Sequence, residues 1–334
     1  MRIQKGILLT AIIAVALVFA FTSGCTGTDT ETDNEISEIH MGYQPSTHQL
    51  AYMTAMKKGW WQADLAPYGV EKVTESEFPT GAPEMAAMIS GKLDVAYVGA
   101  APVISAIANG LDARIVSAVQ VQGSNLVLRS DLPYESPEDL RGLTIATFPP
   151  GTIQDTLLRT WLSENGLEPG KDIEISDMGP GDAITALEAG SVDAAFLPHP
   201  APSVIEVDGK GRSVVASGEM QKNHACCVLV VSGDLIRNHP DLVEQIVKTH
   251  IKATEYNLVN QDEAAEIFSE KTKWDVETVK KSLNDWDGSW ISDPNTIVGS
   301  VMDYTEVQAD LGYIPQPLAQ DEIFDLSFYG KATA

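Results

Sequence analysis

Short apolar runs alternate with segments of helical periodicity along most of the chain, and turns rich in Gly and Pro separate them. Runs of β-forming residues predict strands, whereas apolar positions three and four residues apart predict helices. Strands are expected at 36–43, 70–78, 113–121, 126–128, 143–148, 173–178, 213–217 and 224–232. Helices are expected at 49–57, 104–109, 153–165, 203–207, 242–260, 262–272, 276–283, 294–311 and 321–328. This alternation is typical of an α/β protein.

A short segment occurs twice in the chain. Residues 91–102 have the sequence GKLDVAYVGAAP, and residues 190–201 have the sequence GSVDAAFLPHPA. Each copy begins with Gly, carries Asp three residues later, continues as an apolar run with an aromatic residue at the same place, and ends in small residues and Pro. The two acidic residues, Asp94 and Asp193, are expected to hold the turn between a helix and a strand.

The similarity between the two copies extends upstream. Residues 80–89 and 179–188 both have the pattern of a Gly/Pro turn that opens a short helix, which Gly then closes. Earlier still, residues 41–45 align with residues 145–149. A unit of turn, helix and strand needs a sheet to join, so the repeat predicts two Rossmann-like α/β lobes that are built alike.

The repeat also divides the chain. Residues 36–125 are expected to form the first part of lobe 1, and residues 126–225 to form lobe 2. The last strand-like segment would carry the chain back, so that residues 226–334 complete lobe 1 and add the C-terminal helices. Two strands, near 120–129 and 226–232, would then form a hinge.

Composition and charge restrict the class of protein. The 334 residues suit two domains of ordinary size, and a hydrophobic content of 44% is enough for two cores. The formal net charge is −25 and the pI is about 4.4, which argues against a nucleic-acid-binding protein, because such proteins need a basic surface. This acidity fits a protein outside the cytoplasm or in a salty cell.

The first residues have the pattern of a signal peptide, which is expected to span residues 1–24. Arg2 and Lys5 form a positively charged start, and residues 7–21 are an apolar run that is short for a membrane span. The sequence therefore indicates export.

Thr22-Ser23-Gly24-Cys25 is similar to a lipobox, which predicts lipidation of Cys25 and anchoring to the outer face of the cell membrane. Thr22 departs from the usual aliphatic residue, so an uncleaved membrane anchor and a plain signal peptide are alternatives. The polar residues 25–35 are expected to form a tether that lets a domain work near the membrane.

Three turns between a strand and a helix are expected to meet at one edge of the first lobe, namely residues 43–48, 80–83 and 99–102. In open α/β sheets, ligands bind beyond the carboxyl ends of the strands. Two of these turns offer hydroxyl groups, all three precede helices, and none contains Lys or Arg. Neutral donors and helix N-termini can hold a small anion or a polar head group, but not a large polyanion.

Several of these features occur together in one known family. A tether at a lipidated Cys, a first strand that ends in a polar turn, the pattern G-x-x-D-x-A before an apolar strand, and SPEDLRGLTIAT at residues 136–147 make the chain similar to the substrate-binding proteins of ABC importers. These importers take up nitrate, sulfonates, taurine and thiamine-pyrimidine precursors. The resemblance covers residues 36–329. It implies a type II periplasmic-binding-protein fold, with two lobes and a two-strand hinge.

The resemblance also implies a mode of action. A small anionic or zwitterionic solute, similar to a sulfonate, taurine or nitrate, would bind in the cleft and favour closure of the lobes. The closed form would then dock on a membrane permease that works with an ATPase. The expected protein is a monomer without enzymatic activity, and it needs no cofactor and no metal.

The resemblance places the cleft residues by position. The expected ligand-binding residues are Tyr43, Gln44, Ser46, Thr47, His48, Thr80, Gly81, Gly99, Ala100, Gln120, Phe148, Gly151, Thr152, Pro198, His199 and His224. Many relatives carry a run similar to Trp-Glu-Pro after the second copy of the repeat, whereas this chain has Leu197-Pro198-His199-Pro200. The resemblance therefore does not assign the second contact of the ligand.

Some of these candidates have a structural interpretation as well. Tyr43 and Phe148 occupy matching positions in the two lobes, so they either sandwich a planar body or belong to the core. His48 and His199 come from opposite lobes, and they either donate to an anionic head group or are solvated loop residues. A metal site would need more ligands at fixed spacing.

Two further pairs are expected to be structural. Trp60 and Trp61 would end the first helix and cover it against the sheet. Cys226 and Cys227 are adjacent in a predicted strand, so their side chains should point to opposite faces and serve as small buried hydrophobes.

The alternative functions are a pyrimidine-precursor-binding protein and a pyrimidine synthase-like enzyme on the same fold. Such a synthase uses His and clustered Cys near the cleft, which His224-Ala225-Cys226-Cys227 resembles in part. Two cysteines are fewer than that cluster needs, and export would separate the enzyme from cytosolic substrates. A sensor ectodomain would need a membrane or signalling segment after Phe328, where none is expected.

Overall fold

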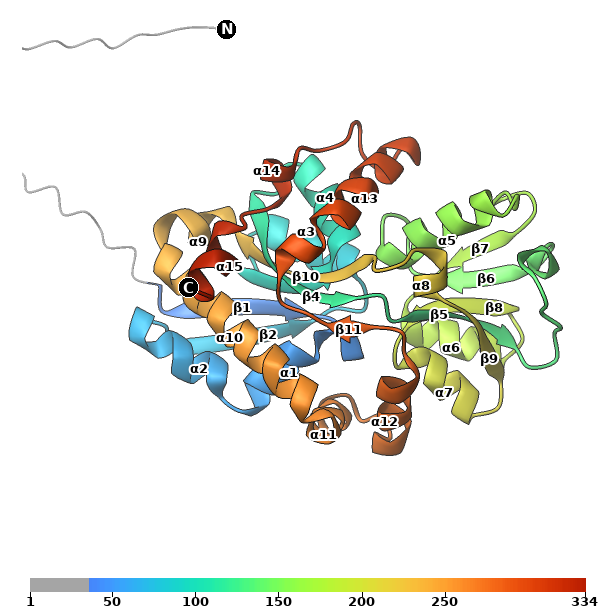
Figure 1. Ribbon diagram of the computed structural model, residues 1–334, viewed down its shortest axis with the longest axis horizontal. Helices are drawn as coiled ribbons and strands as arrows, with labels where there is room; N and C mark the ends of the chain where they lie inside the picture. The colour runs from blue at the N-terminus through green and yellow to red at the C-terminus, as the bar shows by residue number, and fades with distance from the viewer. Residues whose placement is uncertain (1–35) are drawn as a thin grey trace, which may run out of the picture. The chain divides into compact units, whose positions relative to one another are not determined.

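The computed structural model describes residues 36–334 (Figure 1). The expected signal peptide at 1–24, the tether at 25–35 and the lipidation of Cys25 lie outside the described residues. Within residues 36–334, no helix combines the length and apolar character that crossing a bilayer requires. The described part is a mixed α/β fold with two sheets, as the alternation of strand and helix patterns predicts.

The larger sheet has six strands, which are β1 (Glu38–Tyr43), β2 (Lys72–Glu77), β3 (Val95–Gly99), β4 (Ala113–Val121), β10 (Ala225–Ser232) and β11 (Ser289–Trp290). Their order across the sheet is β11-β4-β10-β3-β1-β2. Strand β1 runs parallel to β2 and β3, whereas β10 runs antiparallel to its two neighbours, β3 and β4. A late segment of the chain therefore lies in the middle of this first sheet.

The smaller sheet has five strands, which are β5 (Ser124–Arg129), β6 (Thr144–Thr147), β7 (Glu174–Asp177), β8 (Ala194–Pro198) and β9 (Gly211–Ala216). Their order is β7-β6-β8-β5-β9. Strand β6 runs parallel to its neighbours β7 and β8, whereas β5 is antiparallel to both β8 and β9. This second sheet thus has the same pattern as the first: two parallel neighbours around a central strand, followed by an antiparallel strand.

The internal repeat of the sequence is confirmed at the level of strand register. In the first sheet Met41 lies opposite Val95, and in the second sheet Ile145 lies opposite Ala194, which are the positions that the alignment pairs. The Asp94 carboxylate accepts a hydrogen bond from the backbone N–H of His40 at 2.8 Å. The equivalent carboxylate in the second copy makes the same kind of bond to the strand beside it. Both are structural, as expected, although they hold the neighbouring strand and not only the turn.

Helices cover both sheets. Around the first sheet lie α1 (Leu50–Lys57), α2 (Trp60–Leu65), α3 (Gly81–Ile89), α4 (Ala100–Ala108), α9 (Gly233–Asn238), α10 (Pro240–Val259), α11 (Gln261–Thr272), α13 (Val298–Asp310), α14 (Gln320–Ile323) and α15 (Ser327–Ala332). Around the second sheet lie α5 (Ile153–Glu164), α6 (Pro180–Glu188), α7 (Ala201–Val207) and α8 (Ser217–Met220). Short 3₁₀ turns occur at η1 (Thr47–Gln49), η2 (Ala66–Tyr68), η3 (Pro137–Leu140) and η4 (Pro294–Thr296).

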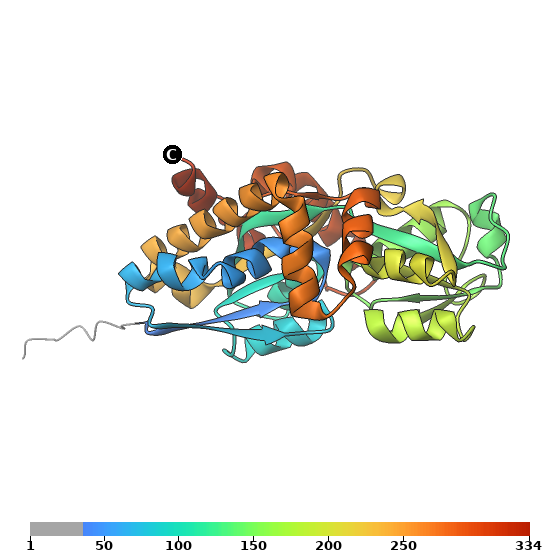
Figure 2. The same cartoon turned by 90° about the horizontal axis from the view of Figure 1, so that it is seen from below.

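One helix touches both halves. Helix α12 (Val276–Asp285) packs against α11 beside the first sheet and against α7 beside the second (Figures 1 and 2). Its apolar face buries Val279 and Leu283. Because it contacts both sides, α12 helps to fix how the two sheets face each other.

The segment around Trp60 differs from the prediction. The first helix ends at Lys57, and Gly59 adopts the left-handed conformation with φ of 69°, so that Trp60 begins a second helix. Trp61 is buried and packs against Tyr52 at 6.5 Å between ring centroids. The aromatic residues favour burial, and the left-handed glycine lets the chain turn and bring Trp61 inward.

The chain passes between the sheets twice. It leaves the first sheet after Val121, enters the second at Ser124, and returns between Ala216 and Ala225. The predicted lobe limits at 125 and 225 lie close to these crossings and stay a prediction. Asp287 ties the two crossings together, because its carboxylate accepts hydrogen bonds from the N–H of Gly123 at 2.8 Å and from that of Gly218 at 2.6 Å.

Candidate functional site

A small pocket lies where the two sheets face each other. It has a volume of about 20 Å³, which is room for one or two water molecules. Its lining comes from both lobes and consists of Gln44, Ser46, His48, Gly81, Gly99, Pro102, Phe148, Thr152, Ile153, Gln154, Pro198, Cys226 and Cys227.

The fold explains why these residues meet. Gly99 ends β3 and Pro198 ends β8, so the pocket lies at the carboxyl ends of the parallel strands. Thr152 is the N-cap of α5, where its hydroxyl accepts a hydrogen bond from the N–H of Asp155. Gly81 begins α3, and a Cβ at this position would lie 2.5 Å from the Pro102 ring, so only Gly allows this close approach.

The structure brings part of the predicted site together at this pocket, namely Gln44, Ser46, His48, Gly81, Gly99, Phe148, Thr152 and Pro198. Five further residues line it that are not among the expected ligand-binding residues, namely Pro102, which lies in one of the expected turns, Ile153, Gln154, Cys226 and Cys227. Gln154 could have been found from its place in the first turn of a helix that follows a cleft loop. Cys226 and Cys227 entered only through the synthase alternative, and their common orientation could not be predicted because it depends on an irregular strand.

The remaining predicted residues do not line this pocket, namely Tyr43, Thr47, Thr80, Ala100, Gln120, Gly151, His199 and His224. Gly151 lines a neighbouring cavity of about 190 Å³ between α3, α4 and the loop before α5. Tyr43 belongs to the core, where it stacks on Tyr52 at 4.8 Å between ring centroids and donates to the Glu77 carboxylate at 2.8 Å. Its interpretation as half of an aromatic sandwich with Phe148 is therefore not supported by its position.

His199 lies in a contact between the lobes. The backbone N–H of Thr47 and its hydroxyl both donate to the His199 carbonyl, at 3.2 and 3.0 Å. The His199 ring is buried and its Nδ1 lies 2.8 Å from the Ser282 hydroxyl, whereas its Nε2 has no hydrogen-bond partner among residues 36–334. Burial, with a smaller effect from His48, lowers the pKa of His199 to about 3. The ring is thus neutral near pH 7 and is not a solvated loop residue.

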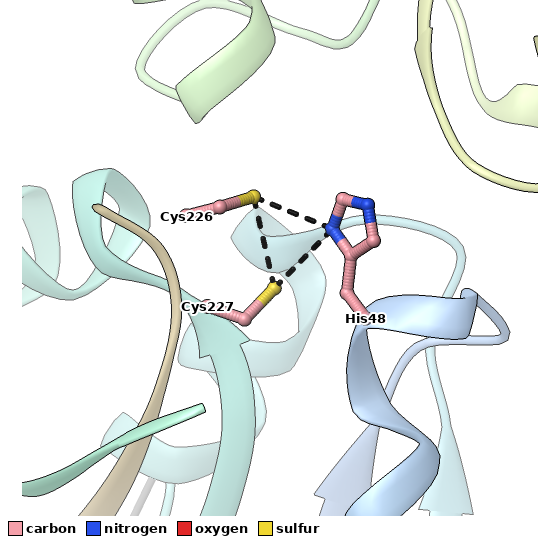
Figure 3. A group of neighbouring side chains, drawn as sticks. All are labelled: His48, Cys226 and Cys227. Atoms are coloured by element: carbon pink, nitrogen blue, oxygen red, sulfur yellow. Dashed lines mark hydrogen bonds between the residues drawn. The ribbon is translucent and has the colours of Figure 1, made fainter. Parts of the chain in front are cut away.

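His48 is buried as well, and it faces two thiols (Figure 3). Its Nε2 lies 2.7 Å from the carbonyl of Gly123. Its Nδ1 lies 3.4 Å from the sulfur of Cys226 and 3.9 Å from the sulfur of Cys227. The two sulfurs are 3.9 Å apart.

The expectation that Cys226 and Cys227 point to opposite faces is wrong. The pairing of β10 with β4 shifts register between Ala225 and Cys227 and again between Cys227 and Val228. Such a bulge breaks the strict alternation of side chains, so both sulfurs turn toward His48. Burial of the two cysteines agrees with the expectation.

The pKa values of the two thiols are shifted in opposite directions. A hydrogen bond from the Cys226 thiol lowers the pKa of Cys227, and His48 acts in the same direction. The same bond, together with burial, raises the pKa of Cys226 well above its ordinary value. The first proton therefore leaves this pair more readily than it leaves an isolated thiol.

Among the described residues, the lining of the pocket includes no Lys or Arg, as the turn sequences predict. The amide of Gln44 donates to the Glu84 carboxyl group at 2.8 Å. Burial raises the pKa of Glu84 well above its ordinary value, which favours its neutral form. The pocket therefore offers neutral amides, hydroxyls, an imidazole and thiols.

Two lobes with mixed sheets built on one plan, joined by two chain crossings and together lining a pocket, have the architecture of the bilobal binding proteins. Residues 32–270 match the NMT1-like family, and the chain belongs to that family.

Two relatives are named as binding proteins of small solutes. The chain is 27% identical to a putative aliphatic sulfonates-binding protein of Bacillus subtilis, over 98% of this chain and 97% of that protein. It is 28% identical to the taurine-binding periplasmic protein of Escherichia coli, over 56% of this chain and 58% of that protein. Both of these relatives are named as binding proteins.

Solved structures agree on the fold. A ligand-binding component of an ABC-type import system from Staphylococcus aureus, solved with zinc bound, covers 89% of this chain and 99% of its own, with a TM-score of 0.76 and 19% identity. The periplasmic nitrate-binding protein NrtA from Synechocystis covers 90% and 89%, with a TM-score of 0.76 and 18% identity. The periplasmic-binding-protein fold and the family predicted from the sequence are thereby confirmed.

Proposed function

We propose that this protein is the extracytoplasmic solute-binding component of an ABC importer, which captures a small anionic or zwitterionic solute and delivers it to a membrane permease. The observation that carries this proposal is the pocket whose lining comes from both look-alike lobes. Membership of a family whose relatives bind sulfonates, taurine and nitrate supports the solute class.

The size of the pocket supports a mechanism of opening and closing. A space of about 20 Å³ does not hold taurine, which supports a separation of the lobes when such a solute enters. Bound between the lobes, the solute would favour the closed arrangement by as much as its affinity for the closed form exceeds that for the open form.

The chemistry of the lining supports recognition by neutral groups. Gln44, Thr152 and Gln154 bring amide and hydroxyl groups to the lining, and α3 and α5 begin beside the same space, at Gly81 and Ile153. Helix N-termini and neutral donors bind a sulfonate or nitrate without a basic side chain.

The N-terminal segment fits the same function. We propose that residues 1–24 direct export and that Cys25 carries a lipid, with residues 25–35 as the tether. Edman sequencing and mass spectrometry of the membrane-bound protein test this: a blocked N-terminal Cys25 with a diacylglycerol mass supports it, and an intact Met1 contradicts it.

A screen of melting temperature tests the solute class. The purified protein is heated with taurine, short alkanesulfonates, nitrate, bicarbonate and a hydroxymethylpyrimidine. A solute present at about 100 times its Kd stabilises the folded form by about 2.7 kcal/mol, which raises the melting temperature measurably. No shift with any sulfonate, taurine or nitrate would contradict the proposed class.

The second candidate is a pyrimidine-related enzyme or binding protein, and the thiols beside His48 are the observation that favours it. In the same screen a shift with the hydroxymethylpyrimidine alone would favour a pyrimidine-binding protein. Chemical conversion of that compound, followed by liquid chromatography, would favour an enzyme.

A further inference from the structure

We propose that His48, Cys226 and Cys227 form a site for a thiophilic metal ion, with Zn²⁺ as the best fit, and that the fourth coordination position faces the pocket. The three side chains come from η1 and β10, which are far apart in the sequence, and their ligand atoms all lie within 4.8 Å of one another. The proposal does not depend on the function in import.

The distances fit a tetrahedral ion. With Zn–S of about 2.3 Å and Zn–N of about 2.0–2.1 Å, a tetrahedral site places two sulfurs about 3.8 Å apart and the nitrogen about 3.6 Å from each sulfur. The observed separations are 3.9 Å between the sulfurs and 3.4 and 3.9 Å from Nδ1 to Cys226 and Cys227. An ion can therefore enter with side-chain movements of a few tenths of an ångström.

The tautomer of His48 prepares Nδ1 for a metal. A carbonyl oxygen only accepts hydrogen bonds, so the Nε2 that lies 2.7 Å from the Gly123 carbonyl must carry the ring proton. The lone pair of the neutral ring is then on Nδ1, which faces both sulfurs (Figure 3). A hydrogen bond from the second ring nitrogen to a carbonyl is the usual outer-shell support of a metal-bound His.

Neighbouring side chains also contact Cys227 and His48. The amide of Gln49 approaches the sulfur of Cys227 at 3.9 Å, and its oxygen accepts from the backbone N–H of Gln44 at 2.6 Å. The Trp286 ring lies 5.8 Å from the His48 ring, between centroids. These contacts limit movement of the ligands before an ion arrives, which lowers the entropic cost of binding.

The three side chains are buried, and the side of the cluster that faces the pocket is open. His48 is 1% exposed, Cys226 2% and Cys227 5%, and all three line the small pocket. Two cysteines and one histidine with an open fourth position are a known ligand set for Zn²⁺. The thiol protons leave to solvent as the ion binds, so the two thiolates cancel its charge. The fourth position is then free for water or a donor atom of a molecule in the pocket.

A hydrogen-bonded trio without metal is the competing interpretation, and Co²⁺ separates the two. The reduced full-length chain is titrated with Co²⁺ under anaerobic conditions. A sulfur-to-cobalt charge-transfer band that saturates at one ion per chain, and that Zn²⁺ abolishes, is the expected result. The similarity to the zinc-containing Staphylococcus aureus structure is a similarity of fold. It is not evidence for a metal site in this chain, which the titration tests directly.

Substitutions assign the ligands. Cys226→Ser, Cys227→Ser and His48→Gln should each weaken Zn²⁺ binding in a chelator competition by more than about 100-fold, beyond the range seen for outer-shell changes. His40→Gln, at an exposed histidine outside the cluster, is the control and should keep both the band and the affinity. Cys25→Ser removes the third thiol of the chain and should likewise keep both. Circular dichroism of each metal-free variant establishes that it folds.

Two results would overturn the proposal. One is the absence of the charge-transfer band in the reduced protein. The other is a Cys226→Ser/Cys227→Ser double variant that still binds one Zn²⁺ with unchanged affinity.

Discussion

At the scale of single residues, Gly123 connects the crossing between the sheets with the pocket. It adopts φ of 85°, and its carbonyl accepts from His48. A Cβ at this position would lie 2.5 Å from Nε2 of Gln120 and 2.9 Å from Nε2 of His48. Backbone freedom and close packing therefore both require a glycine here.

We expect Gly123→Ala to lower the free energy of unfolding by about 2–4 kcal/mol, because left-handed strain of about 1–2 kcal/mol is added to the close contacts. Gly142→Ala is a matched control, since Gly142 has φ of 81° but no atom near its Cβ position. It should cost about 1–2 kcal/mol, from strain alone. Urea unfolding measures both. Equal losses in the two variants would show that the contacts of Gly123 are unimportant.

The sequence could place residues at the edge of the sheets but could not orient them. The position of Gln44 and Thr152 follows from strand ends and helix starts, which local patterns reveal. Tyr43 stands at such an end too, yet its ring points into the core because Tyr52 and Glu77 provide better partners there. The burial of His199 depends on α12, which lies far along the chain.

At the scale of elements, the repeat was the most informative feature of the sequence. Two copies with the same turn, helix and strand must join sheets in the same way, and the observed register bears this out. The bulge in β10 and the second helix after Gly59 were missed. The sequence of β10 has the pattern of a regular strand, so its register shifts are not visible in it. The sequence around Gly59 likewise does not show that a second helix begins after the left-handed glycine.

Helix α5 illustrates how an element can serve the pocket. Thr152 caps it, and we expect Thr152→Ala to cost about 1 kcal/mol of stability. The same substitution should weaken binding of the strongest solute in the melting screen by about three- to tenfold, since a loosened first turn no longer directs its N–H groups. Calorimetric titration gives the affinity.

Ser232→Ala is the matched control, because Ser232 caps α9 away from the pocket. It should lower stability by a similar amount and leave the affinity unchanged. If Thr152→Ala also kept full affinity, α5 would not contribute to the binding site.

At the scale of the whole described unit, polar contacts hold the lobes together. The Tyr313 hydroxyl, beyond α13, donates to the Asp155 carboxylate in α5 at 2.7 Å. Lys281 in α12 forms an ion pair with Glu206 in α7 at 2.9 Å. The sequence did not predict these contacts, because they join segments far apart in the chain and depend on how the lobes meet.

We expect Tyr313→Phe to favour the open arrangement and to weaken solute binding by about tenfold, the equivalent of one lost hydrogen bond of about 1.4 kcal/mol. Tyr256→Phe removes a hydroxyl that bonds only within the first lobe, to Glu263 and Lys58, and should leave the affinity unchanged. Small-angle scattering of the solute-free variants would detect the opening. If Tyr313→Phe kept the affinity of the unchanged protein, the hydrogen bond between Tyr313 and Asp155 would not contribute to closure of the lobes.

The central place of β10 has a consequence for biogenesis. Residues 124–216 form a contiguous sheet that can assemble as soon as it emerges from the ribosome or the translocon, whereas the other sheet waits for Ala225–Ser232. Until that segment arrives, β3 and β4 expose the edges that it will later join, and such edges attract other chains. A nascent chain of this protein thus needs protection longest in the half that was made first.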